Sequence, residues 1–247
     1  MYYGTKLRLL WLWYHVATAY SLYYCYTNDL MSWVYYSIIW AFILVIVGGY
    51  AGWHRYFTHK SFKTDKITRT IMLWLGVMQG IGKPITVVGI HRYHHAHSDT
   101  EKDIHSPKYS KWWEILFGYY KEPKLSKNYI KDLMHDKQIR FLQKNYFKVI
   151  IAINIALLIL HPVLPGLLFG LGNLYVMYST GIIINNLNHI GGSNNNFIYA
   201  LLTFGEGWHD NHHEDSKRYS NWIKWYQIDI TGLVIKWFLK REHGSIS

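Results

Sequence analysis

The stretch SIIWAFILVIVGGYAGWHRYFTH, residues 37–59, decides the fold. It belongs to a segment, Met31 to Trp53, that contains no Asp, Glu, Lys or Arg. An apolar run of about 20 residues is long enough to cross the hydrocarbon core of a bilayer. Two histidines, His54 and His59, follow directly. The sequence therefore predicts a membrane-spanning helix that ends in a histidine pair at one membrane surface.

Further apolar stretches complete the predicted membrane part. We expect an all-α integral membrane protein, a single domain over residues 1–247 with a four-helix stalk and a cytosolic helical cap. The apolar run from Ile71 to Gly82 is only about 12 residues long, which favours an interfacial or re-entrant segment over a crossing. The predicted spans are residues 9–28, 32–53, 146–163 and 166–188.

The positions of the charges predict the topology. All 26 Lys and Arg residues fall at 6–8, 55–148 and 217–241. The bends YTNDLM and HPVLPG contain neither Lys nor Arg, so the positive-inside rule places both bends outside. We therefore expect a multi-pass protein with both termini in the cytoplasm and a cytosolic cap formed by residues 54–145 and 190–247. This pattern does not distinguish the endoplasmic reticulum from a bacterial inner membrane.

Composition limits the possible chemistry and partners. Cys25 is the single cysteine, and the chain has no CxxC pair, so any metal has to be held by histidine. A net charge of +11 is compatible with nucleic acid, an anionic membrane surface or a phosphate-bearing substrate. Nucleic acid is not expected as a partner, because no recognition motif is present and charge-free spans would serve no purpose there. Membrane lipid is the expected partner.

Fifteen histidines are present, and their spacing is informative. The pattern H-x-x-H-H occurs at residues 91–95 and again at residues 209–213. Helical positions three and four apart share a face, so we expect each cluster to aim its imidazoles at a common point. His54 and His59 are five apart, which does not suit a regular helical face. That pair therefore requires a helix end or a distortion.

These groups are expected to meet on the cytoplasmic side, where the second and fourth spans end. Asn185 and His189 are four apart at the end of the fourth span and can face the same way. Nine imidazoles exceed the ligand demand of one tetrahedral zinc, which indicates two metal ions. Imidazole suits zinc, copper, iron or nickel, so spacing does not name the metal. The predicted histidine ligands are His54, His59, His91, His94, His95, His189, His209, His212 and His213.

Other polar residues receive lesser roles. Glu206 and His209 form E-x-x-H, but soluble di-iron bundles need two such motifs and further carboxylates. We therefore expect Glu206 to hydrogen-bond to an imidazole and orient it. His97 and His105 are expected beside the centre or at the surface. The remaining histidines are interpreted as surface or interfacial residues: His15, His135, His161 and His243.

The histidine motifs resemble those of the membrane-bound fatty acid desaturases, specifically the acyl-CoA delta-9 type. The likeness runs from about Gly49 to Asp229. Its residues are HRYFTHKSF at 54–62, HRYHHAHSDTEKDIHSP at 91–107, NNLNH at 185–189 and GEGWHDNHH at 205–213. Thr86 and Val87 stand where the family usually has aromatic residues, which bears on acyl chain length and double-bond position.

The resemblance implies a centre of two iron ions (Fe2+/Fe3+) held by the nine histidines, with Asn185 acting through water. It implies that O2 and two electrons are used to form a cis double bond in a saturated fatty acyl chain, with acyl-CoA favoured as substrate. The electrons are expected from a separate donor such as cytochrome b5 or ferredoxin, because no HPGG haem signature is present.

The basic residues of the cap allow two interpretations. They could contact the phosphates of CoA, but an ordinary attraction to anionic lipid is favoured for most of them. The residues concerned are Lys60, Lys63, Lys66, Lys108 and Lys111.

Two alternative functions stay open. A hydroxylase or other oxygenase of the same histidine-box superfamily would use the same ligands and give an alcohol in place of an alkene. A membrane metal transporter would place its ligands near the middle of the membrane along a pathway, whereas these clusters lie at or beyond the inner ends of the spans.

Overall fold

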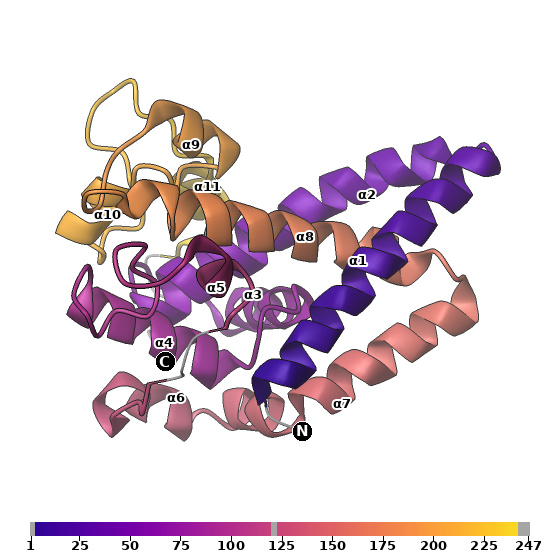
Figure 1. The fold of residues 1–247 in the computed structure, drawn as a ribbon, viewed down its shortest axis with the longest axis horizontal. Coiled ribbons are helices and arrows are strands. Elements are labelled where there is room, and N and C mark those ends of the chain that lie inside the picture. The colour runs from indigo at the N-terminus through magenta and orange to yellow at the C-terminus, as the bar shows by residue number, and fades with distance from the viewer. Residues whose placement is uncertain (1–2, 120–122, 242–247) are drawn as a thin grey trace.

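The computed structural model describes residues 3–119 and 123–241. Within these residues every regular element is helical, and an isolated β-bridge pairs Asn195 with Trp208. Figure 1 shows α1, α2 and α7 extending to one side, while α4, α5, α9, α10 and α11 gather at the other. The predicted all-α fold is confirmed.

Four long helical segments form the extended side. Two of them combine stretches of α-helical hydrogen bonding with stretches of the wider π-helical form. The segments are α1 (Tyr3–Thr27); α2 (Met31–Ile43) continued by the π-helix η1 (Leu44–Thr58); α7 (Lys137–Leu160); and the run of η3 (Gly166–Gly170), α8 (Leu171–Tyr178), η4 (Ser179–Ile184) and η5 (Leu187–His189).

Three of these segments are long and apolar enough to cross a membrane: Met31–Thr58, Lys137–Leu160 and Gly166–His189. They correspond to the second, third and fourth predicted spans. The 25-residue helix α1 is also long enough, but it is less apolar and begins with Lys6 and Arg8 in its first two turns. The crossing by α1, and with it the four-helix stalk, stays a prediction.

The helix α7 begins nine residues before the predicted span. Asp136 precedes it, and its carboxylate accepts a hydrogen bond of 2.9 Å from the backbone N–H of Ile139. Such a cap satisfies an N–H that the helix leaves without a partner. The helix therefore starts in polar sequence at Lys137 and only then becomes apolar.

The helix α3 (Lys66–Met78) packs directly along η1. Glycines allow the close approach, since a Cβ atom on Gly48 would overlap the backbone at Leu75, and one on Gly76 would overlap the indole of Trp53. With 13 residues, α3 is too short to cross a bilayer. This length agrees with the interfacial or re-entrant segment predicted at Ile71 to Gly82.

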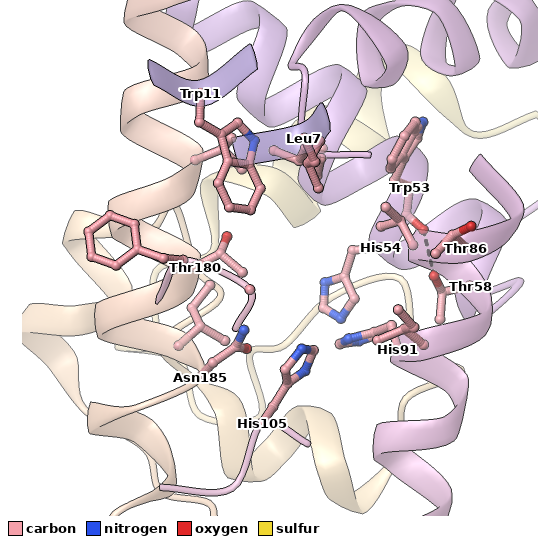
Figure 2. A pocket seen from close by; sticks show the side chains of 18 of the residues that line it. Leu7, Trp11, Trp53, His54, Thr58, Thr86, His91, His105, Thr180 and Asn185 are labelled. Atoms are coloured by element: carbon pink, nitrogen blue, oxygen red, sulfur yellow. Dashed lines mark hydrogen bonds between the residues drawn. The ribbon is translucent and has the colours of Figure 1, made fainter. Parts of the chain in front are cut away.

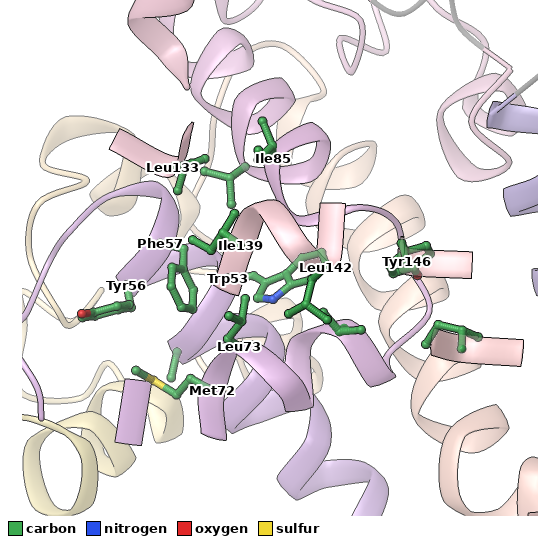
Figure 3. Close-up of a cluster of buried hydrophobic side chains, with 14 of the residues drawn as sticks. Trp53, Tyr56, Phe57, Met72, Leu73, Ile85, Leu133, Ile139, Leu142 and Tyr146 are labelled. Atoms are coloured by element: carbon green, nitrogen blue, oxygen red, sulfur yellow. The ribbon is translucent and has the colours of Figure 1, made fainter. Parts of the chain in front are cut away.

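The remaining helices, here called the cap helices, gather beside the four long segments, and a large apolar cluster joins the two parts. Figure 3 shows Trp53, Leu73 and Leu142 of this cluster lying together, from η1, α3 and α7. The cap helices are α4 (Pro84–His97), α5 (Trp112–Leu116), η2 (Lys127–Tyr129), α6 (Lys131–His135), α9 (Phe197–Leu202), α10 (His209–Glu214), α11 (Ile230–Val234) and η6 (Ile235–Leu239).

Both ends of the described chain lie on the cap side. Arg8 in α1 donates from Nη1 to the carbonyl of Gly118 at 3.2 Å. The backbone N–H of Arg241 donates to the carbonyl of Lys63 at 2.9 Å. The two ends therefore share one side of the molecule, as the topology requires, and the assignment of that side to the cytoplasm stays a prediction.

Candidate metal centre

The nine predicted histidines converge from four parts of the chain: the end of η1, α4, η5 and α10. Their ring nitrogens form two groups, and within each group the candidate ligand atoms all lie within 4.8 Å of one another. The first group has five histidines and the second has four. The five-histidine group is His54, His59, His91, His95 and His212; the four-histidine group is His94, His189, His209 and His213.

In the five-histidine group the ring nitrogens face one another. His212 Nε2 lies 3.0 Å from Nε2 of His54 and 3.1 Å from Nε2 of His95. His91 Nε2 lies 3.2 Å from Nε2 of His95. Two nitrogens that are each about 2.1 Å from one metal ion lie about 3 Å apart. These spacings therefore fit ligands that share an ion.

The four-histidine group has the same character. His209 Nε2 lies 2.9 Å from Nε2 of His189 and 3.1 Å from Nε2 of His213. The ring centre of His94 is 5.0 Å from that of His189 and 5.4 Å from that of His213. Four imidazoles leave room for a further ligand on an ion that prefers more than four.

Each H-x-x-H-H cluster is divided between the two groups. In α4, His91 and His95 join the five-histidine group, whereas His94 joins the other. In α10, His209 and His213 stay together and His212 crosses over. The expectation that each cluster aims at a common point was too simple, because adjacent helical positions point about 100° apart. In each cluster the two histidines that are four positions apart belong to the same group. The remaining histidine, His94 in α4 and His212 in α10, belongs to the other group.

The π-helix η1 explains the five-residue spacing of His54 and His59. In a π-helix the N–H of one residue bonds to the carbonyl five positions earlier. The N–H of His59 donates to the carbonyl of His54 at 3.2 Å, and the two ring centres lie 5.0 Å apart. The predicted distortion at the end of this helix is present.

Three carboxylates face the outer nitrogens of the histidines. Glu206 Oε2 lies 2.7 Å from Nδ1 of His54. This contact agrees with the expectation that Glu206 orients an imidazole. The imidazole belongs to His54 and not to His209, the histidine of the E-x-x-H motif. Asp103 accepts from Nδ1 of His94 at 2.9 Å. A third carboxylate, Asp99, lies 3.3 Å from Nδ1 of His189. A proton held on Nδ1 leaves Nε2 free to bind a metal.

Sequence analysis did not identify Asp99 and Asp103 as partners of histidines, nor the residues that hold Glu206 in place. The buried guanidinium of Arg55 donates to Glu206 Oε1 from Nε at 3.0 Å and from Nη2 at 2.7 Å. It also donates to both carboxylate oxygens of Asp229, at 2.8 and 3.0 Å. Arg55 therefore fixes Glu206, and through it His54, to the segment that precedes α11. The only available signal was the position of Arg55 beside His54.

Burial favours the uncharged form of several of these rings. It lowers the pKa of His91, His95, His209 and His212 well below the usual range. Burial and the neighbouring His94 lower the pKa of His213 to about 3. Neutral imidazole is the form that binds metal ions. The buried Nε2 of His59 has no hydrogen-bond partner within the described ranges, and a metal ion would satisfy it. The residues present thus fit a two-metal centre.

An apolar cavity of about 190 Å³ adjoins the five-histidine group. Figure 2 shows Leu7 and Trp11 of α1 at one side of it and His54 and His91 at the other. Trp53 lines a further part of the wall. The cavity therefore brings apolar surface directly to candidate metal ligands.

Asn185, Thr86 and Val87 also line this cavity. The π-helix η4 ends at Ile184, and the N–H of Asn185 donates to the carbonyl of Thr180 at 2.8 Å. A turn thus separates η4 from the 3-10 helix η5 that contains His189, so Asn185 and His189 do not belong to one regular helix. That the two side chains face the same way stays a prediction. The role of Asn185 as a ligand through water stays a prediction.

The other histidines lie outside the two groups. His97 stacks on Tyr93 with ring centres 4.1 Å apart. His105 is buried beside His94 and lines the cavity. His15, His135 and His161 lie away from the groups, in α1, in α6 and after α7. His243 lies outside the described residues.

Comparison with known proteins places the chain in a family. A family model described as fatty acid desaturase matches residues 31–244. An icosanoyl-CoA 5-desaturase of Limnanthes douglasii is 34% identical over 215 residues, which are 81% of this chain and 60% of that protein. An sn-1 stearoyl-lipid 9-desaturase of Anabaena variabilis is 33% identical over 200 residues, 75% of this chain and 72% of that protein. The chain belongs to the fatty acid desaturase family.

Proposed function

We propose that the protein is a fatty acyl desaturase that introduces a cis double bond into a saturated acyl chain. The observation that carries this proposal is the apolar cavity bordered by His54 and His91 of the five-histidine group. An acyl chain in this cavity has its carbons beside candidate metal ligands and apart from water.

Two iron ions fit the two histidine groups best among the metals that imidazole binds, given the family of the chain. When bound, they supply oxygen activation, in which O2 and two electrons remove hydrogens from two neighbouring carbons. The contribution of the protein is to orient the rings. Glu206, Asp103 and Asp99 orient His54, His94 and His189 through their outer nitrogens.

The cavity selects an extended hydrocarbon. Its walls include Leu7, Trp11, Trp53 and Ile90, and apolar walls bind a chain by removing its surface from water. Exclusion of water also protects a reactive centre from side reactions. The wall residues Thr86 and Val87 are small, so this side of the cavity leaves space that an aromatic residue would fill.

For the acyl carrier we favour CoA. The relatives include proteins named for icosanoyl-CoA and for stearoyl lipid, so the names alone support either carrier. Lys108 and Lys111 flank exposed Tyr109 and Trp112 and are suited to a phosphate or a lipid surface. Lys60 is less suited, because its ammonium pairs with Asp132 at 3.0 Å.

We further propose a four-span protein with both termini in the cytoplasm, which receives electrons from a separate donor such as cytochrome b5 or ferredoxin. The charge pattern of the sequence supports this topology. The position of both described chain ends on the cap side is consistent with it.

The alternative with the best support is a hydroxylase that uses the same histidines and the same cavity. Expression in a desaturase-deficient host separates the two, with derivatised fatty acids measured by gas chromatography and mass spectrometry. The wild type is expected to give a new monounsaturated acid and His94→Ala none. An alcohol without an alkene would contradict the desaturase proposal and support the hydroxylase. The exposed His135→Ala serves as the control and should retain the product.

A further inference from the structure

Arg92 lies between two candidate ligands, His91 and His94, in α4. We propose that Arg92 is a positioning residue, which fixes the end of η1 against α4 and so sets the spacing of the five-histidine group. Its guanidinium bonds to backbone carbonyl groups of η1 and to the carboxylate of Asp132 in α6. The helix α6 supplies none of the nine histidines of the two groups.

The five-histidine group depends on how η1 and α4 meet. His54 and His59 come from η1 and its end, and His91 and His95 come from α4. The ring centre of His59 lies 5.2 Å from that of His91 and 4.4 Å from that of His95. Ligands that share one ion have to keep such a spacing. The relative position of the two helices therefore decides whether this group can hold an ion.

Arg92 bonds directly to the last two residues of η1. Its Nε donates to the carbonyl of Thr58 at 2.9 Å, and its Nη2 donates to the carbonyl of Phe57 at 2.6 Å. The last carbonyl groups of a helix have no N–H partner within that helix. A side chain of α4 thus completes the end of η1, at the residue that directly precedes His59.

The cap binds the other side of the guanidinium. Arg92 donates from Nη1 to Asp132 Oδ1 at 2.7 Å and from Nη2 to Asp132 Oδ2 at 3.0 Å. Its Nη1 also donates to the carbonyl of Tyr129 at 2.8 Å. Together with the two bonds to η1, these bonds engage all five N–H donors of a guanidinium. Arg92 therefore holds η1 in one orientation relative to α4 and α6.

Asp132 also binds the residue that follows His59. Its Oδ2 lies 3.0 Å from the ammonium of Lys60. Lys60 has a φ of 55°, a left-handed conformation that residues other than glycine adopt at a cost. The chain thus leaves η1 in a conformation that needs support, and Asp132 supports it on both sides of His59.

The charge of Arg92 and its geometry have opposite effects on a bound cation. A positive charge beside a metal site repels the ion, so removal of the charge alone should strengthen metal binding. Loss of the five hydrogen bonds should instead allow η1 and α4 to shift and should weaken metal binding. The sign of the change in affinity therefore distinguishes the two roles.

The test measures binding of Co2+ to the purified, metal-free full chain by absorption, with one histidine group at a time. His94→Ala removes a ligand from the four-histidine group and leaves the five-histidine group complete, and His95→Ala does the converse. In the His94→Ala protein, Arg92→Gln is expected to lower Co2+ affinity about 10-fold or more, as loss of groups that orient ligands does. In the His95→Ala protein, Arg92→Gln should leave Co2+ affinity nearly unchanged, because the four-histidine group takes no ligand from η1.

Two further variants separate positioning from charge and from a general loss of stability. Arg92→Lys keeps the charge but not the planar five-donor geometry, so it should bind Co2+ about as weakly as Arg92→Gln. Arg69→Gln breaks an arginine–carboxylate pair of the same kind, which joins α3 to Asp136 at the start of α7. It should leave the Co2+ affinity of the five-histidine group unchanged, even where it lowers the Tm.

Four results would overturn the proposal. They are unchanged or stronger Co2+ binding in Arg92→Gln, full affinity in Arg92→Lys, an equal loss in both histidine groups, and an equal loss in Arg69→Gln. The inference rests on the two-metal centre and not on the reaction proposed for it, and the titration uses no fatty acyl substrate. A protein that showed the expected Co2+ affinities but gave no new fatty acid would therefore contradict the proposed function alone.

Discussion

The backbone N–H of His59 donates to the carbonyl of His54 at 3.2 Å. This bond spans five residues and belongs to the π-helical segment η1. A regular α-helix would point these two side chains about 140° apart, since five steps of 100° exceed one turn by that amount. The wider helix instead brings both imidazoles into the five-histidine group. A helix that is predicted to cross the membrane thus ends as part of the metal centre.

Carboxylates behind the rings are expected to control metal affinity. Glu206→Gln removes the negative charge beside His54, and Asp103→Asn removes the charge beside His94. Loss of such a partner typically lowers metal affinity 10- to 100-fold. Titration of the metal-free protein with Co2+, followed by absorption, measures this change.

The matched control for that titration is Asp210→Asn. Asp210 lies between two candidate ligands in the sequence, but its carboxylate accepts a hydrogen bond from Ser193. Its replacement should leave Co2+ affinity unchanged. If Asp210→Asn weakened Co2+ binding as much as Asp103→Asn does, the loss of affinity would come from the change in net charge near the site and not from the orientation of the His94 ring.

The stability of the metal-free protein is expected to fall at mildly acidic pH. Burial lowers the pKa of His105 and of His213 to about 3, from an ordinary value of 6.5. Between these values the unfolded chain binds protons that the folded chain does not, so stability is full above pH 6.5 and decreases as the pH falls towards 3. Each such histidine contributes about 1.4 kcal/mol per pH unit to the free energy of unfolding.

Unfolding of the metal-free protein by denaturant at pH 7, 6 and 5 measures this slope. His213→Ala should reduce the slope by about one proton. A slope that is the same in the wild type and in His213→Ala would show that the buried ring of His213 does not stay neutral.

Val87 is expected to limit the acyl chain. It lines the cavity together with Thr86, and Val87→Trp would fill space that part of the chain occupies. Each methylene that no longer fits should lower kcat/KM about 10-fold or more. Fatty acid profiles from the desaturase-deficient host should therefore shift towards shorter products, while the smaller change Val87→Leu should shift them less. An unchanged profile in Val87→Trp would remove this residue from the acyl site.

Much of the fold and of the site follows from the sequence because their signals are local. The charge-free run Met31 to Trp53 predicts a spanning helix, and the repeated H-x-x-H-H predicts ligands. Which histidines of the two clusters share a group was not predictable, because it depends on how α4 and α10 face each other. The contact of Asp103 with His94 joins residues nine positions apart across a turn that has no regular period.

The contacts of Arg55 were hidden for a different reason. Its partners Glu206 and Asp229 are 151 and 174 residues away, and a single arginine beside a histidine gives no indication of them. Whether α1 crosses the membrane also stayed undecided, because its composition is less apolar than that of the other long segments. A helix that lines an internal cavity on one face needs fewer apolar residues than one surrounded by lipid.

The most direct test of the two-metal centre is the iron content of the purified full chain, measured by mass spectrometry for the wild type, His94→Ala and His95→Ala. These adjacent residues belong to different groups. The account predicts about two iron ions per chain in the wild type and about one in each variant, with both retained in His135→Ala. A wild-type chain that holds a single ion, or variants that each retain two, would contradict it.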